Sequence, residues 1–187
     1  MNSSTNLTNQ FLIAMPSMQD QNFSQTVTYI CEHTEEGAMG IVVNRPTNLH
    51  LNDILDQLDI TDIDLKSGEE HIYIGGPVQP ERGFVLHSDD HKWDSTLKIT
   101  DDISVTTSKD ILESIAAGNG PNDHLVALGY AGWASGQLEE EISANAWLSG
   151  PADSQIIFNT PAEQRWKAAA QLLGVDLDLI SGDAGHA

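Results

Sequence analysis

The stretch VTYICEHTEEGAMGIVV, residues 27–43, predicts an antiparallel β-hairpin and with it the class of the fold. Residues 26–31 alternate between two faces with a period of two and are rich in β-forming types, and residues 39–43 are a second apolar run. The polar segment Thr34–Gly37 between them ends in a glycine, which can adopt the positive φ of a tight turn. We therefore expect the two runs to pair as neighbouring strands.

Outward from this hairpin, short strands and helices follow one another without the regular alternation of a parallel α/β fold. Strands are predicted at residues 11–15, 71–74, 83–87, 97–99, 103–105, 125–128 and 156–158. Helices are predicted at residues 51–58, 109–117, 137–143 and 161–173. Residues 71–74 and 83–87 are expected to form a second hairpin or a meander corner. This order predicts an α+β fold with many short strands and about four helices.

The composition favours one cytosolic domain over residues 1–187, with flexible ends at 1–6 and 181–187. The chain has 28 acidic and 8 basic residues, a net charge of −20, and the basic ones are scattered, so DNA and anionic membranes are repelled. The single cysteine, Cys31, excludes an internal disulfide and any cluster of thiolates. No apolar run approaches the ~18 residues of a membrane span, and no signal-peptide pattern is present. We therefore expect neither membrane nor direct nucleic-acid binding.

Several motifs in the same order resemble the YqgE/AlgH family of bacterial proteins, from about Asn6 to the end of the chain. They are YICEHTEEGAMGIVVNRP (Tyr29–Pro46), IGGPV (Ile74–Val78), RGFVLH (Arg82–His87) and LGYAGWASGQLEEE (Leu128–Glu141). The resemblance implies an α+β fold whose strands curl into a small barrel-like sheet surrounded by helices, and a cytosolic location. It also implies a regulatory role in transcription that does not require contact with DNA. It supplies no catalytic or cofactor-binding residues.

Cys31 and His33 are the candidates for catalysis, because residues two apart on a strand share a face. An imidazolium beside the thiol would lower its pKa and produce a nucleophile or a redox sensor. The alternative is packing, since Cys31 continues the apolar face of Val27 and Tyr29 and free cysteine is among the most buried residue types.

Asn44 and Arg45 end an apolar run and are candidates for ligand or partner binding. The guanidinium fork of Arg45 could bind a carboxylate or a phosphate through a bidentate pair of hydrogen bonds. It could equally neutralise one of the many carboxylates of the chain itself.

Two glycine-rich segments are either ligand loops or backbone corners. Gly75 and Gly76 precede a proline, a combination that suits a sharp corner. In GYAGWASGQL, residues 129–138, the glycine spacing matches neither a phosphate loop nor a nucleophile elbow, and Ser135 stands one position away from the nucleophile pattern. We interpret this segment as tight turns packed by Trp133, and keep Gly75, Gly76, Gly132 and Trp133 as candidate binding residues.

Histidines and acidic residues do not occur at the spacing of an established metal site. His87 and His91 enclose two aspartates but lack a third ligand from a fixed element. Residues 62–68 are similar to a calcium loop, except that Lys66 holds the fifth position and the glycine comes one residue late. We predict no metal and no other cofactor.

These observations together predict a non-enzymatic regulatory or interaction protein that acts through protein partners. An acidic surface suits the basic faces of such partners. The alternative is a small-molecule binding protein, or a thiol-based enzyme or redox sensor that uses Cys31 and His33.

Overall fold

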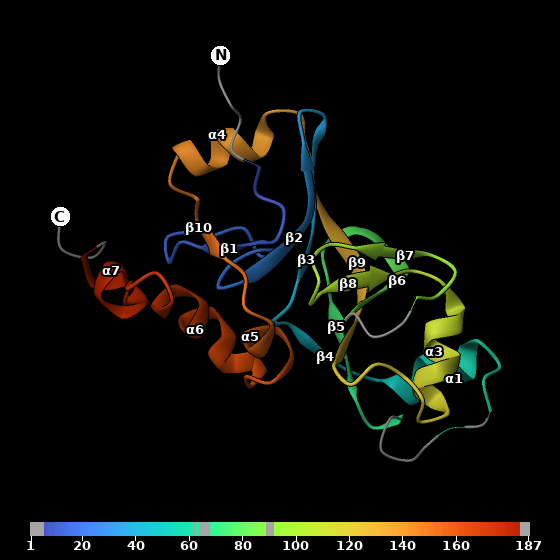
Figure 1. Ribbon diagram of the computed structural model, residues 1–187. Coiled ribbons are helices and arrows are strands. Elements are labelled where there is room, and N and C mark those ends of the chain that lie inside the picture. Colours follow the sequence, from blue (N-terminus) through green and yellow to red (C-terminus); the bar gives the residue numbers. More distant parts are fainter. Residues whose placement is uncertain (1–5, 62, 64–67, 89–91, 184–187) are drawn as a thin grey trace.

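A computed structural model describes residues 6–61, 63, 68–88 and 92–183, and its main feature is one curled, mainly antiparallel sheet of ten strands (Figure 1). The strands are β1 (Gln10–Ala14), β2 (Val27–Thr34), β3 (Gly37–Val42), β4 (Pro46–His50), β5 (His71–Ile74), β6 (Val78–His87), β7 (Thr96–Lys98), β8 (Ser104–Thr106), β9 (His124–Ala134) and β10 (Trp147–Pro151). Their order is β10-β1-β2-β3-β9-β6-β8-β7, with β4 beside β5 and β5 beside β9. The predicted α+β class is thereby confirmed.

The hairpin predicted from residues 27–43 is present as β2 and β3. The two strands are antiparallel, with Thr28 opposite Val42 and Thr34 opposite Gly37. The pairing is interrupted once, because Ile30 lies opposite Gly40 whereas Glu32 lies opposite Met39. β2 therefore contains one extra residue, a β-bulge, and its alternation of faces changes at that point.

The longest strand, β9, occupies the centre of the sheet and corrects one prediction. The glycine-rich segment that follows Leu128 was expected to turn, but β9 continues through it to Ala134. Gly129 adopts a φ of 77° within the strand, so the irregularity that the glycines indicated is accommodated without ending the strand.

β5 and β6 do not form the hairpin that the sequence predicts. Both strands pair with Ala127 and Leu128 of β9, β5 in parallel and β6 antiparallel, so they lie along the two edges of β9. The connection must therefore cross β9. A side chain at Gly76, whose φ is 155°, would collide with the backbone of Tyr130, and one at Gly75 would collide with the carbonyl oxygen of Gly129.

The described residues contain six α-helices, more than the expected four or so. They are α1 (Leu51–Gln57), α3 (Lys109–Ala116), α4 (Gln137–Ser143), α5 (Ser154–Phe158), α6 (Arg165–Gln171) and α7 (Leu177–Asp183), with a short 3-10 helix at Ala162–Gln164. α1, α3 and α4 match predicted helices, and the helix predicted at 161–173 is divided between the 3-10 turn and α6.

The strand predicted at residues 156–158 was wrong, because these residues belong to α5. Asp153 caps this helix by accepting a hydrogen bond from the Gln155 backbone N–H, and the neighbours Ile156 and Ile157 are both buried, which an alternating strand would not allow. The last strand is instead β10, which pairs with β1 at the edge of the sheet. Its sequence, WLSGP, lacks a strand signal because it carries glycine and proline, which an edge strand tolerates.

The apolar side chains form three clusters between the sheet and its helices. The largest joins the sheet to α5, α6 and α7, the second lies under α1 and α3, and the third lies under α4. Figure 1 shows where these helices lie around the sheet. None of the helices in the described part of the chain is long and apolar enough to cross a membrane.

Candidate functional site

An open groove of about 620 Å³ runs over β2, β3, β6 and β9 and is the main candidate for a functional site. The residues that line it are Glu32, Thr34, Glu36, Gly37, Ala38, Met39, Val78, Arg82, Phe84, Tyr130, Gly132 and Trp133. Two of the sequence-derived candidates, Gly132 and Trp133, therefore lie in one site, which we call the sheet groove.

The floor of the sheet groove is aromatic and apolar. The rings of Phe84 and Tyr130 meet edge to face, with centroids 5.5 Å apart. The guanidinium of Arg82 lies over the Phe84 ring, 5.4 Å from its centroid, so its charge interacts with the ring face. Met39, a half-buried and flexible side chain, completes the floor from β3. Such a floor can receive one large apolar side chain.

The sheet groove continues toward the edge of the sheet. A second hollow of about 300 Å³ shares Met39 and Phe84 with it and extends to β7. There Leu97 is 48% exposed, a high value for a leucine, and Asp94 stands beside it. The two hollows together form one extended depression, suited to a segment of chain more than to a compact small molecule.

The charged side chains along this depression are mainly acidic. Glu32 and Glu36 lie at the β2–β3 end and Asp94 lies at the β7 end, against Arg82 as the one basic residue among the described lining residues. Since the whole chain carries a net charge of −20, the long-range field has the same sign. The depression is therefore electrostatically matched to a basic ligand.

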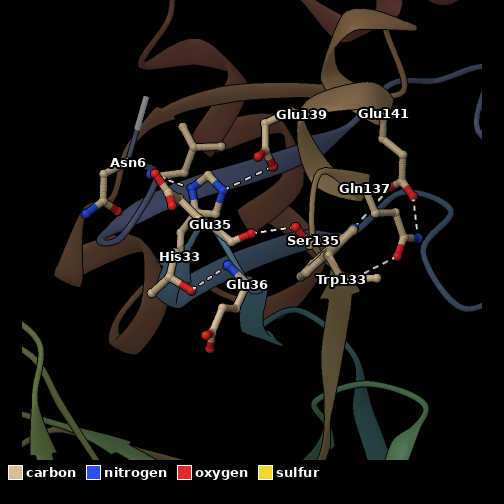
Figure 2. Close-up of polar contacts among 12 residues, drawn as sticks. Asn6, His33, Glu35, Glu36, Trp133, Ser135, Gln137, Glu139 and Glu141 are labelled. Carbon is tan, nitrogen blue, oxygen red and sulfur yellow. Dashed lines mark hydrogen bonds and ion pairs between the residues drawn. The ribbon is translucent and has the colours of Figure 1, made fainter. Parts of the chain in front are cut away.

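The β2–β3 end of the sheet groove is fixed in place by α4 (Figure 2). His33 accepts a hydrogen bond from the Leu7 backbone N–H at Nδ1, and its Nε2 donates to Glu139 at 3.1 Å. Ser135 donates its hydroxyl hydrogen bond to the backbone carbonyl of Glu35 across 2.5 Å. The turn that carries Glu36 is thus attached to the end of β9 and to α4 (Figure 2).

The wall of the sheet groove at Trp133 is held by one carboxylate. Glu141 accepts hydrogen bonds at Oε1 from the indole N–H groups of Trp133 at 3.0 Å and Trp147 at 2.9 Å. Its Oε2 accepts a third from Gln137 at 2.8 Å. Trp133 and Trp147 are almost fully buried and pack edge to face with Phe23 among their neighbours.

Cys31 and His33 do not share a face, in contrast to the expectation from their spacing. The bulge in β2 places Cys31 in the large core cluster with Tyr29, whereas His33 contacts Leu7 and Glu139 on the other side of the sheet. Burial raises the pKa of the Cys31 thiol, and Glu32 adds to the shift. This environment favours the neutral thiol over the reactive thiolate.

Asn44 and Arg45 bind the chain's own backbone. The guanidinium of Arg45 donates hydrogen bonds to the carbonyl oxygens of Gln21, Asn22 and Ser24, each at 2.7 Å. Burial lowers the pKa of Arg45, and the nearby Asp20 opposes this shift. The neighbouring Asn44 accepts from the Val27 N–H and donates to the Gln25 carbonyl. Asn44 and Arg45 together close the loop before β2. The sequence suggested a ligand or partner contact, or an ion pair with a carboxylate of the chain, and neither describes this role.

Gly75 and Gly76 form the backbone crossing over β9 and do not line the sheet groove.

The side chains considered for a metal do not form a site in the described part of the chain. His87 is buried, and its Nε2 lies 2.7 Å from the Thr106 hydroxyl. His91 lies outside the described residues, and so does most of the acidic segment 62–68. Within the residues that are described, no group of three or more metal-ligating side chains converges.

Sequence reasoning missed the aromatic floor of the sheet groove and a second cavity, around Arg165. Part of the signal for the floor was present, because the motifs RGFVLH and GYAGW each carry one of its aromatic rings, Phe84 and Tyr130. Their pairing depends on β6 lying beside β9, a contact about 40 residues apart that no local pattern indicates.

Comparison with known proteins identifies the family. A family model described as AlgH-like matches residues 11–178. A UPF0301 protein of Thioalkalivibrio sulfidiphilus is 59% identical over 187 residues, which cover 100% of both chains. Another, from Saccharophagus degradans, is 57% identical over 181 residues, covering 97% of this chain and 89% of the relative.

Solved structures agree with this result. The solution structure of the AlgH protein from Pseudomonas aeruginosa is similar with a TM-score of 0.81 and 52% identity, over 100% of this chain and 99% of that one. A Corynebacterium diphtheriae protein with 20% identity has the same fold, with a TM-score of 0.75 over 97% of this chain and 94% of that chain. By the extent of both the sequence and the structural match, the chain belongs to the AlgH-like family.

Proposed function

We propose that the protein is a non-enzymatic, cytosolic interaction protein with a regulatory role, and that it acts through a protein partner and not through direct contact with DNA. The sheet groove binds an extended segment of that partner, in which one large apolar side chain is flanked by Lys or Arg. The observation that carries this proposal is the Phe84–Tyr130 floor beside acidic side chains at both ends of the depression.

The energetics of the site suit a reversible, regulatory contact. Burying one large apolar side chain on the floor contributes about 1.5–3 kcal/mol. Basic residues facing Glu32 and Glu36 contribute mainly to the rate of association and to the choice of partner, because the two carboxylates are exposed and screened by salt. We therefore expect an affinity that falls as the salt concentration rises.

The alternative of a thiol enzyme or redox sensor is less well supported. Cys31 lies in the core, its pKa is raised by burial, and the bulge in β2 directs His33 elsewhere. Among the described residues that line the sheet groove, none is a cysteine or a histidine. The arrangement is suited to recognition more than to proton or acyl transfer.

The proposal is tested with a random peptide library selected against the folded protein, followed by affinity measurements on the selected peptides. We expect enrichment of sequences with one aromatic or long aliphatic residue flanked by Lys or Arg. The double variant Glu32→Lys/Glu36→Lys should weaken their binding at least about tenfold, since two attractive charges become repulsive.

The matched control is Glu113→Lys/Glu163→Lys, which makes the same change of charge at two exposed positions away from the sheet groove. It should retain most of the binding. Equal losses in the two double variants, or selected peptides without a basic and apolar preference, would overturn the proposal. If both double variants bind duplex DNA at physiological salt, the result would instead favour a nucleic-acid partner.

A further inference from the structure

A second cavity lies apart from the sheet groove, where the beginnings of β5 and β9 face α5 and α6. Its volume is about 340 Å³, at the lower end of the range of small-molecule sites, which is about 300–1,000 Å³. Charged side chains of both signs line it. Arg165 comes from the start of α6, and Glu70 and Asp123 come from the residues directly before β5 and β9. We call it the α6 cavity.

The cation in this cavity is buried without a countercharge. Arg165 is only 6% exposed, and no carboxylate within the described residues lies within 4.0 Å of its guanidinium. It is held by backbone carbonyl oxygens, with Nε donating to Thr160 at 2.7 Å and Nη1 to Val43 at 2.6 Å. The ring of Tyr73 packs against it, 5.2 Å from Cζ.

This arrangement leaves part of the guanidinium fork unused. Nη2 takes part in none of the hydrogen bonds formed among residues 6–61, 63, 68–88 and 92–183, and Arg165 lines the cavity. Burying a charge without a partner is costly, and a guanidinium fork matches a carboxylate in geometry and charge. The free side of Arg165 is therefore a prepared position for an anionic group.

The carboxylates of the cavity have spare capacity as well. Glu70 is joined through Oε2 to Nε2 of His124, at 2.5 Å. Asp123 lines the same cavity, and its side chain forms no hydrogen bond or ion pair with the rest of the described chain; its charge acts on His124 through space and helps to raise the pKa of that imidazole. A positively charged group or an N–H donor between these two carboxylates would satisfy them.

Between the charged groups the lining is mixed, with polar side chains from His71, Asn122 and His124 and apolar ones from α5 and β9. Ile157 and Phe158 from α5 and Leu125 from β9 complete the wall. A ligand that fits all three parts carries a carboxylate, an ammonium and a short apolar side chain on one small frame.

We propose that the α6 cavity binds a small zwitterion of the α-amino-acid class. Its carboxylate is bound by Arg165, its ammonium by Asp123 and Glu70, and its side chain lies against Phe158. An inorganic phosphate would also suit Arg165, but two nearby carboxylates oppose a dianion. The proposal is independent of peptide binding in the sheet groove, so that either can fail alone.

The test is a calorimetric and NMR titration of the intact protein with leucine, valine and phenylalanine. Each is matched with its analogue without the amino group, its analogue without the carboxylate, and inorganic phosphate. We expect one or more of the amino acids to bind and each analogue to bind at least about tenfold more weakly, because each lacks one of two charged contacts. Chemical-shift changes should be confined to the residues around α5, α6 and the starts of β5 and β9.

The variant Asp123→Asn should weaken binding of the amino acid at least about tenfold while leaving the carboxylate-only analogue unchanged. Asp102→Asn, an exposed site with the same change of charge, is the control and should bind as the original chain does. Arg165→Lys keeps the positive charge but removes the guanidinium fork. Its circular dichroism spectrum is measured first, to show whether the variant folds, and its binding of the amino acid is then compared with that of the original chain. No binding of any amino acid, equal binding of the carboxylate-only analogue, preferential binding of phosphate, or an unchanged affinity in Asp123→Asn would each overturn the proposal.

Discussion

The carboxylate of Glu141 offers a sharp test of how the wall of the sheet groove is built, through the variant Glu141→Ala. Its Oε1 atom accepts both indole N–H groups, from Trp133 and Trp147, which are 6% and 3% exposed. Removing the carboxylate leaves two buried donors without acceptors, and each unsatisfied donor costs about 1–3 kcal/mol. Water can reach the half-exposed position of Glu141, so we expect a combined loss of about 3 kcal/mol.

A loss of this size should lower Tm by about 6–12 °C, since a chain of this length shifts by about 2–4 °C per kcal/mol. Urea unfolding followed by far-UV circular dichroism measures the free energy directly, and its m-value should stay unchanged. The control is Glu140→Ala on the same helix, an exposed residue that should change the free energy of unfolding by less than about 0.5 kcal/mol. A loss below about 1 kcal/mol for Glu141→Ala, or an equal loss in the control, would refute the assignment of this carboxylate as the shared acceptor.

Three further predictions concern the backbone crossing, a histidine and the thiol. Gly76→Ala should cost at least about 3 kcal/mol or prevent folding, because its Cβ would collide with the β9 backbone. In the same urea titration Gly132→Ala should unfold almost as the original chain does, because its Cβ would make only ordinary van der Waals contacts, 3.5 Å from the Tyr130 side chain and 3.8 Å from that of Val78. Burial lowers the pKa of His124 but its hydrogen bond and charge pairing with Glu70 outweigh this, so the pKa is raised. The resulting stabilisation is complete below the unfolded value of about 6.5 and is lost as pH rises through the folded pKa; Glu70→Gln should therefore reduce stability at pH 5.5 more than at pH 9, and an equal reduction at both would contradict the pairing. Cys31 should react with a thiol reagent only at the rate of unfolding, and fast labelling of the native protein would contradict its burial.

The fold could be predicted from the sequence where the signal is local. The β2–β3 hairpin, α1, α3 and α4 each carry their own periodicity and turn residues, and each is present. The strand β10 was missed because its glycine weakens the strand pattern and its proline suits only an edge, and whether a strand lies at an edge depends on the whole sheet. The crossing from β5 to β6 was missed for a related reason, since a short glycine-containing connection usually indicates a hairpin.

The candidate site was predictable to a smaller extent. Gly132 and Trp133 were singled out and do line the sheet groove, but Cys31 and His33 were separated by a bulge that adds one residue without any sequence signal. Arg45 was expected to meet a carboxylate or a ligand and instead holds three backbone carbonyls. Arg165, the most deeply buried cation described, was read only as part of a helix, because burial of a charge is decided by tertiary packing.

The central position of β9 has a consequence for synthesis on the ribosome. β3 ends at Val42, and its neighbour β9 is not complete until Ala134, about 90 residues later. At translation rates of about 5–20 residues per second, the nascent chain spends several seconds with the edge of β3 unpaired, and the edge of β6 waits with it. Unpaired edges attract other nascent strands, so the period before β9 emerges is the stage at which this protein most needs protection from aggregation.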